Sequence, residues 1–405
     1  MVHAHGLGDH SPVPPLGAPP GAPASCGARH HALRTFQWFR GDSGDPAELV
    51  TAFLEGNGLP VRKLGRTGDK DRPDGHGAIC GASLYVSADA GCVMINATAG
   101  GPSPVPAVPD VYAVIWVHAE VPAQGSTDDW ALGSWHASWT PGQHAGAVQR
   151  VRDAIGRGDV YQVNVVGHAS APYTGNPAAA LRRVAALPGA RYGGVLAGPG
   201  GRWAIATASP ETLVEVRDGR VITRPIKGTR PATAAGHREL LASAKERAEH
   251  IMIVDLERND LARLPGTGPV RVDELFAVRR WSGLWQAESV VSAALDGDVG
   301  LAELLRAVCP GGSVTGAPKH AALDQIAALE PVGRGVSMGG LGWIGHDHVD
   351  LGLSIRTVAV DGARVHAWAG GGITADSDPA DEVAEAAAKA GPLRAALAGT
   401  VTGAA

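Results

Sequence analysis

Two pairs of glutamates stand at helical spacing in the second half of the chain. Glu246 and Glu249 are three residues apart, and Glu382 and Glu385 repeat that spacing with Lys389 four residues further on. Residues three or four apart share one face of a helix. Two such pairs facing each other across a cleft would form an oxygen-rich site for a hard divalent cation, Mg2+. Each pair alone is equally an ordinary solvated helix face with an i,i+4 ion pair.

A lysine and two glycine-rich segments could complete such a site. Lys227 stands in segment 224–230, after Glu211 in the segment Ser-Pro-Glu. Near a cation and arginines, its charged form would be disfavoured and its amine could act as base or nucleophile, although a solvated lysine at a strand end is the plainer interpretation. Glycines 370–372 could hold an anion through their amides or form a tight turn. The loop 310–319 lacks the GxxxxGK[ST] order, so nucleotide binding is not supported.

Charge and composition limit the class of ligand. The net charge of -5 and the pI near 6.3 give no positive field for nucleic acid or an anionic membrane, so we expect a small substrate. The four cysteines lie far apart without a CxxC pair, which favours neither a zinc knuckle nor a disulfide framework and fits a reducing cytoplasm. We find no secretory signal and no apolar run long enough to span a bilayer.

The elements that must position these residues are short strands mixed with helices. We expect a flexible Pro/Gly/His-rich leader over 1–32, whose histidines are alternatively a metal-binding tail, and then one domain over 33–405 with a divergent part 33–141 and a catalytic part 142–405. Hairpins mixed with helices predict an α+β fold with large antiparallel sheets. The expected helices cover 144–156, 237–255, 299–308 and 319–328 and begin again at Asp378, and expected strands cover 203–208, 212–217, 220–224, 340–344, 350–360 and 364–369.

From about residue 158 to its end, the chain resembles the chorismate-utilising enzymes, which include the synthase subunits of anthranilate synthase and aminodeoxychorismate synthase and the isochorismate and salicylate synthases. The segments that carry the resemblance are 158–164 (GDVYQVN), 209–211 (SPE), 226–230 (IKGTR), 248–256 (AEHIMIVDL), 258–261 (RNDL), 310–319 (PGGSVTGAPK), 354–357 (SIRT), 370–373 (GGGI) and 376–379 (DSDP). The resemblance implies the anthranilate-synthase-like two-sheet antiparallel β-sandwich flanked by helices, with chorismate and Mg2+ held between the sheets.

The resemblance also implies roles for individual residues. By motif position, Glu249 and Glu385 would bind Mg2+, supported by Glu246 and Glu382. The residues implied to bind the substrate are Arg356, Lys389, Gly371, Gly372, Thr315 and Gln162.

Two positions distinguish members of this family. The hydroxide-adding enzymes carry a water-activating lysine where this chain has Gln162, and anthranilate synthases usually carry alanine where it has Lys227. The Pro-Ile-Lys-Gly-Thr form looks like aminodeoxychorismate synthase component I, an enzyme of p-aminobenzoate and folate synthesis. There the lysine amine would attack C2 of chorismate as the C4 hydroxyl leaves, and ammonia would then add at C4 and expel the lysine. Glu211 would protonate the departing hydroxyl.

The chain departs from the family pattern at two positions. Gln286 replaces the usual histidine, and Ser337 replaces the usual aromatic residue after Arg-Gly. No segment resembles a glutaminase, so ammonia is expected from a separate glutamine amidotransferase. Two alternatives stay open: amination at C2, giving anthranilate or 2-amino-2-deoxyisochorismate, and a non-catalytic subunit that binds chorismate or an amidotransferase.

Overall fold

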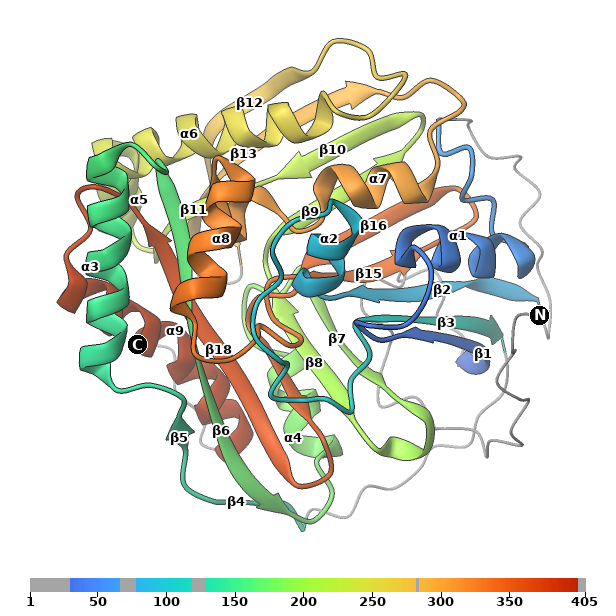
Figure 1. Ribbon diagram of the computed structural model, residues 1–405, viewed down its shortest axis with the longest axis horizontal. Coiled ribbons are helices and arrows are strands. Elements are labelled where there is room, and N and C mark those ends of the chain that lie inside the picture. The colour runs from blue at the N-terminus through green and yellow to red at the C-terminus, as the bar shows by residue number, and fades with distance from the viewer. Residues whose placement is uncertain (1–29, 66–77, 119–128, 282–283, 400–405) are drawn as a thin grey trace.

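Two antiparallel sheets organise the part of the chain that the computed structural model describes, which is residues 30–65, 78–118, 129–281 and 284–399 (Figure 1). In spatial order, the described strands of the first, ten-stranded sheet are β1 (His30–Trp38), β3 (Val111–His118), β2 (Ile79–Val86), β15 (Gly340–Ile344), β16 (His348–Leu353), β9 (Thr212–Arg217), β10 (Arg220–Arg224), β13 (Leu284–Ala294) and β11 (Ile226–Pro231), with β12 (Arg271–Trp281) also paired to β13. Strands β10 and β11 pair with different halves of β13 and therefore lie end to end.

The second sheet has eight described strands. Their order is β14 (Gly316–Ala317), β6 (Gln162–Thr174), β18 (Arg364–Ile373), β17 (Thr357–Val360), β8 (Ala204–Ser209) and β7 (Tyr192–Ala197), and the short β4 (Ala131–Leu132) and β5 (His136–Ala137) also pair with β6. Every pairing between these described strands is antiparallel. The predicted α+β class with two antiparallel sheets is confirmed.

The main apolar core joins the two sheets. Strands β2 and β3 are buried along almost their whole length, which explains the unbroken apolar run of β3, because a strand covered on both faces has no solvent side for polar residues. Across the interface, the ring of Tyr112 on β3 meets Trp203, just before β8, edge to face with centroids 4.8 Å apart. A second core packs β17 and β18 against helices α4 and α9.

The helices cover the outer faces of the sheets. The described helices are α1 (Pro46–Gly56), α2 (Ala88–Met94), α3 (Pro141–Arg157), α4 (Ala178–Ala185), α5 (Ala234–Ala242), α6 (Ala244–Leu261), α7 (Leu301–Val308), α8 (Lys319–Leu329) and α9 (Pro379–Ala398), with short 3-10 turns at Pro199–Gly201 and Gly312–Val314. In Figure 1, α6 runs beside β12 and β13 of the first sheet, whereas α9 lies behind β18 of the second. None of the described helices is long and apolar enough to cross a membrane.

The single helix expected over 237–255 is wrong, because two helices occupy this region. Helix α5 ends at Ala242 and α6 begins at Ala244. Ser243 between them has extended backbone angles, and its hydroxyl accepts a hydrogen bond from the N–H of Glu246. The serine thus caps α6. This hydrogen bond competes with the backbone hydrogen bonds that would continue α5 into α6 as one helix.

The single strand expected over 350–360 is also wrong. Strand β16 ends at Leu353 in the first sheet, and β17 begins at Thr357 in the second. The chain crosses between the sheets at Arg356, whose φ of 47° lies in the left-handed region. This crossing brings Arg356 to the interior between the sheets.

Other local expectations are confirmed. Asp218 and Gly219 have φ values of 50° and 69° and form the tight turn between β9 and β10. Asp378 caps α9 by accepting hydrogen bonds from the N–H groups of Ala380 and Asp381, and Pro379 occupies the first turn.

The expected N-terminal and catalytic parts of the domain share the first sheet, because β2 pairs with β15 along its length. Strand β1 begins at His30, so the last three residues of the expected leader 1–32 belong to this sheet. The rest of the leader lies outside the described residues, as do its histidines before His30.

Candidate active site

A cavity of about 470 Å³ opens where the β11 end of the first sheet meets strand β18 and helices α6 and α9. Most of the predicted site residues line it: Glu211, Lys227, Glu246, Glu249, Arg356, Gly371, Gly372, Glu382, Glu385 and Lys389. They come from both sheets and both helices. The structure therefore brings together the two glutamate pairs, the lysine and the glycine run.

Two glycines let the glutamates approach the strands closely. A Cβ atom added at Gly228 on β11 would lie 3.0 Å from Oε2 of Glu246, and one added at Gly371 on β18 would lie 3.0 Å from Oε2 of Glu382 and 3.8 Å from Oε1 of Glu385. Gly228 also has a φ of 79°, which disfavours other residues. Each helix thus places its carboxylates directly against one strand of the cavity wall.

On the α6 side, both carboxylates have a cationic neighbour. Oε1 of Glu246 lies 3.5 Å from a guanidinium nitrogen of Arg230, and Oε1 of Glu249 lies 3.9 Å from Nζ of the exposed Lys245. Both distances are long for direct ion pairs. The two carboxylates are consequently held loosely.

On the α9 side, one carboxylate is buried and one is half-exposed. The hydroxyl of Ser377 donates to Oε1 of Glu382 at 2.7 Å. Nζ of Lys389 lies 2.7 Å from Oε1 of Glu385 and donates to the carbonyl oxygen of Gly370 at 2.9 Å. Lys389 is therefore fixed beside the glycine run, as a residue that binds a carboxylate substrate would need to be.

The carboxylates influence one another across the cavity. Burial raises the pKa of Glu249, with Lys227 opposing this shift and the negative charges of Glu246 and Glu385 adding to it. Burial also acts to raise the pKa of Glu385, but its ion pair with Lys389 outweighs this and leaves the pKa below its usual value. The negative charges of Glu249 and Glu385 repel each other, and a cation bound between them would reduce this repulsion.

The glutamate oxygens do not form a closed cage for a cation. No three of these glutamate oxygens lie within 4.8 Å of one another; among the described residues, only His30, Cys80 and His118 form such a group. Mg2+ keeps several waters and binds through one or two carboxylates together with substrate oxygens, so it does not require a closed protein cage. Glu249 on α6 and Glu385 on α9 are the residues that would hold it, with Glu246 and Glu382 beside them.

Glu211 and Arg356 lie at the buried floor of the cavity. Burial raises the pKa of Glu211, while Lys227 and hydrogen bonds from Ser313 and the Ile226 N–H oppose this shift. Oε1 of Glu211 has no hydrogen-bond partner among the described residues. Burial lowers the pKa of Arg356, yet a guanidinium stays charged in proteins. A buried acid thus faces Lys227 and Arg356, as a proton donor would.

His250 positions Lys227 although sequence reasoning gave it no role. Its Nε2–H donates to the carbonyl oxygen of Lys227 at 3.0 Å, and its Nδ1 lies 2.7 Å from the hydroxyl of Ser289 on β13. The ring is fully buried, and its hydrogen bond to Lys227 connects α6 to β11. The only sequence signal for this role of His250 was its place directly after Glu249 in a predicted helix. A histidine at such a position suits a packed core equally well.

Two predicted substrate-binding residues do not line the cavity. Gln162 is buried beneath the glycine run, because a Cβ atom added at Gly372 would lie 2.1 Å from its Nε2. The hydroxyl of Thr315 donates to the carbonyl oxygen of Gly311 inside its own loop. Neither residue is among those that line the cavity, and their predicted role in substrate binding stays a prediction.

The two departures from the family pattern differ in position. Gln286 lines the cavity, and its Nε2 has no hydrogen-bond partner among the described residues. Asn164, which was not predicted as a site residue, contributes a similarly unpaired Oδ1. Ser337 is buried and does not line the cavity. Only the first departure can therefore affect a bound ligand directly.

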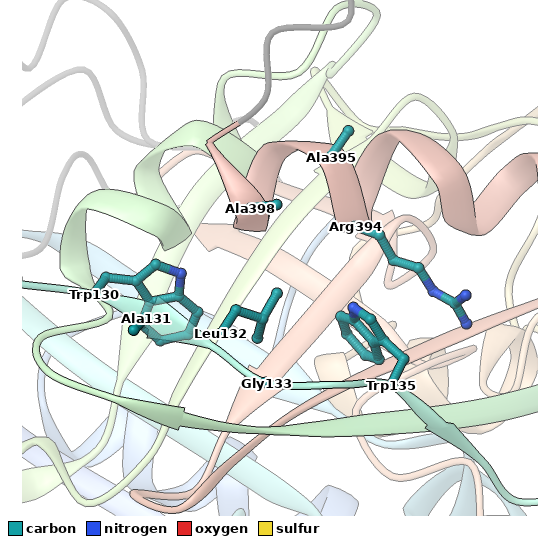
Figure 2. Close-up of a pocket in the computed structure, with 8 residues that line it drawn as sticks. All are labelled: Trp130, Ala131, Leu132, Gly133, Trp135, Arg394, Ala395 and Ala398. Atoms are coloured by element: carbon teal, nitrogen blue, oxygen red, sulfur yellow. The ribbon is translucent and has the colours of Figure 1, made fainter.

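A second hollow of about 630 Å³ lies between the segment 130–135 and the end of α9 (Figure 2). Trp130, Leu132 and Trp135 line one side, and the guanidinium of Arg394 stacks over the Trp135 ring at 5.0 Å. It holds no acid or nucleophile. This hollow has the groups for packing and not for catalysis.

Residues 86–395 match the family model described as chorismate binding enzyme. The chain belongs to this family of chorismate-binding enzymes. The family match covers every predicted site residue, since all of them lie within these bounds.

Named relatives in the family divide between two activities. The chain is 40% identical over 270 residues to anthranilate synthase component 1 of Streptomyces coelicolor, covering 65% of this chain and 53% of that protein. It is 35% identical over 277 residues to aminodeoxychorismate synthase component 1 of Klebsiella aerogenes, covering 67% of this chain and 61% of that protein. The match thus spans about half to three fifths of these relatives.

A solved structure shares the fold. Anthranilate synthase component I from Streptococcus pneumoniae superposes with a TM-score of 0.74 at 24% identity, covering 97% of this chain and 95% of that chain. The two-sheet architecture is therefore the anthranilate-synthase-like fold expected from the sequence.

Proposed function

We propose that this chorismate-binding enzyme is aminodeoxychorismate synthase component I, which converts chorismate and ammonia to 4-amino-4-deoxychorismate and water. The observation that carries this proposal is the position of Lys227, which lines the same cavity as Glu211 and the two glutamate pairs. A lysine that had only a solvated structural role would not need to enter an acidic cavity. The aminodeoxychorismate synthase of Klebsiella aerogenes, at 35% identity, supports the assignment.

The substrate carboxylates have cationic partners in the cavity. Arg356 at the floor and Lys389 on α9 would each form a charge-assisted hydrogen bond with a carboxylate. The backbone amides near Gly371 and Gly372 would add donors beside Lys389. These contacts would hold the ring of chorismate between Lys227 and Glu211.

The proposed reaction has two displacements. The Nζ lone pair of Lys227 forms a bond to C2 of the ring, both ring double bonds shift by one position towards C4, and the C4–O bond breaks as Glu211 gives its proton to the departing hydroxyl. Ammonia then forms a bond to C4, both double bonds return to their original positions, and the C2–N bond to Lys227 breaks. Glu211 takes up the surplus proton of the ammonia. The raised pKa of Glu211 favours the protonated form that the first displacement needs.

Mg2+ is part of the proposal through the residues that would hold it, Glu249 and Glu385. When bound, it would supply positive charge beside the ring carboxylate of the substrate. The protein residues supply the binding, the nucleophile and the proton.

The ammonia would come from a partner. The relatives named above are each called component 1. A separate glutamine amidotransferase is therefore proposed as the source of ammonia, and an ammonium salt should replace it in a purified system.

A product assay tests the proposal. The purified chain is incubated with chorismate, Mg2+, an ammonium salt and an added aminodeoxychorismate lyase, and aromatic products are separated by chromatography. Formation of p-aminobenzoate is expected. Anthranilate as the sole product, or no consumption of chorismate, would contradict it.

A second candidate is amination at C2 to give anthranilate, because the Streptomyces coelicolor anthranilate synthase is 40% identical to the chain. This reaction needs no lysine adduct. A Lys227→Ala variant that kept full ammonia-dependent turnover would favour this candidate over the first.

A further inference from the structure

Three metal-ligating side chains meet at the β1 end of the first sheet, far along the strand order from the β11 cavity. They are His30, the first residue of β1, Cys80 on β2, and His118, the last residue of β3. One ligand atom from each, two imidazole nitrogens and a sulfur, lies within 4.8 Å of both others. The family assignment and the proposed reaction use none of them.

The strand register explains why these distant residues meet. His30 is the direct partner of His118 in the β1–β3 ladder, so both side chains leave the same face of the sheet. On β2, Ile79 pairs with Val117 and Gly81 pairs with Trp116, which leaves Cys80 as the extra residue of a β-bulge. A bulge re-aims a side chain, and this one brings the sulfur to the histidines.

The bulge depends on glycine. Gly81 has a φ of 150°, and a Cβ atom added there would lie 2.4 Å from the Trp343 ring. Another residue would be strained and would also collide with β15. The geometry that presents Cys80 is therefore built into the sequence beside it.

Two of the three side chains are buried, and His118 is partly exposed. His30 is 6% exposed and Cys80 is 7% exposed. The rings of Trp116 and Trp343 meet His30 edge to face at centroid distances of 6.4 and 6.2 Å. These apolar rings limit the access of solvent to the His30 side of the site.

We propose that His30, Cys80 and His118 form a Zn2+ site. Imidazole and thiolate are ligands that Zn2+ accepts together, in tetrahedral geometry at about 2.0 to 2.3 Å. Ligand atoms around such an ion are about 3.5 Å apart, so the 4.8 Å limit leaves a short side-chain movement on binding. With three protein ligands, the fourth position takes a water.

The ion would stabilise the pairing of β1 at the edge of the sheet. Strand β1 is the outermost strand at this end and pairs only with β3 among the described strands. An ion bound by β1, β2 and β3 would resist fraying of this edge, because opening β1 would break a metal bond as well as ladder hydrogen bonds. The site is structural and separate from the oxygen-rich cavity, which suits Mg2+.

Cobalt spectroscopy on the full chain tests the site without using activity. The purified protein is stripped of metal with a chelator, kept reduced, and titrated with Co2+ in buffer without Mg2+. We expect about one equivalent to bind with a thiolate-to-cobalt charge-transfer band, which histidines of the N-terminal segment cannot produce. Added Zn2+ should displace the Co2+, remove the band and raise the Tm.

Matched variants locate the band. Cys80→Ser should abolish it, and His118→Ala should weaken Co2+ binding at least about tenfold. Cys92→Ser, at a buried cysteine of α2, and Cys26→Ser should both retain it. Circular dichroism confirms that each variant is folded.

Three outcomes would overturn the proposal: no charge-transfer band in the wild-type protein, a band that persists in folded Cys80→Ser, or a band lost in Cys26→Ser or Cys92→Ser. If Cys80→Ser does not fold, His118→Ala decides, since unchanged Co2+ affinity in that variant excludes His118 as a ligand. None of these results depends on turnover of chorismate, so they are independent of the proposed function.

Discussion

The two ends of the ten-stranded sheet are built differently. Near β1, strands β2 and β3 are buried along almost their entire length and belong to the main apolar core. At the other end, β11 is only half-buried, and its residues face the acidic cavity. Two strands near one end of the sheet thus lie inside the apolar core, whereas the apolar cover stops at β11. The polar groups of the proposed reaction gather at β11, where that cover stops.

Within the part of the chain that the structure describes, buried polar atoms without a hydrogen-bond partner occur in both regions: Nε1 of Trp38 on β1 and of Trp343 on β15, and three atoms of residues that line the cavity. Oδ1 of Asn164, Oε1 of Glu211 and Nε2 of Gln286 all line the cavity without a hydrogen-bond partner among the described residues. A buried polar atom left unpaired costs about 1 to 3 kcal/mol. A polar ligand in the cavity would relieve that cost, so the arrangement favours binding at the expense of stability.

Among the cavity residues, Lys227 is the one whose replacement should reduce turnover most. Lys227→Ala should lower ammonia-dependent p-aminobenzoate formation by about a thousandfold, because the covalent step loses its nucleophile. Steady-state kinetics with added lyase measures this. Lys63→Ala, at an exposed lysine paired with Asp298, is the control and should leave turnover unchanged. Equal turnover in wild type and Lys227→Ala would remove the lysine from the reaction.

The free energy of unfolding tests whether β2 and β11 are packed differently. Leu84 on β2 is fully buried, so Leu84→Ala should lower the free energy of unfolding by about 2 to 5 kcal/mol. Ile226 on β11 is half-buried, and Ile226→Ala should lower it by only about 1 kcal/mol. Urea denaturation of both variants gives the difference. Equal losses would show that the two ends are packed alike.

A variant of Glu385 tests whether the cavity at the β11 end binds Mg2+. Glu385→Gln removes a ligand charge and should raise the Mg2+ concentration needed for half-maximal turnover by about a hundredfold. Glu303→Gln is the matched control, since Glu303 caps α7 far from the cavity and glutamine can still accept that hydrogen bond. An unchanged Mg2+ titration in Glu385→Gln would exclude Glu385 as a ligand.

A buried acid near the cavity, Glu257, gives a prediction about pH dependence. Burial, and then the charge of Asp260, raise the pKa of Glu257 on α6 to about 8, while Lys319 opposes the shift. Because the folded pKa lies above the unfolded value, this group's stabilising contribution is complete below the unfolded pKa. It declines as the pH rises towards 8.

Glu257→Gln should remove this decline. From pH 5 to 8, the Tm of the glutamine variant should rise relative to wild type by about 2 °C per pH unit. Calorimetric scans across this range measure the difference. Parallel Tm curves for the two proteins would show that Glu257 keeps an ordinary pKa in the fold.

Local features of this protein could be predicted from its sequence. The glutamate spacing on α6 and α9, the cap at Asp378 and the turn at Asp218-Gly219 all depend on neighbouring residues, whose hydrogen bonds and steric limits act over a few positions. The ordered motifs also indicated the family and the fold. Most of the predicted site residues, including Lys227 and Glu211, therefore do line the cavity.

Several contacts between distant segments could not be predicted and are seen in the folded chain alone. The crossing of the chain between sheets at Arg356, the burial of Gln162 under Gly372, and the support of Lys227 by His250 all depend on contacts between separate elements. The meeting of Cys80 with two histidines depends on strand register and one bulge. A one-residue shift in register turns each side chain to the opposite face, and no local pattern around these residues fixes that register.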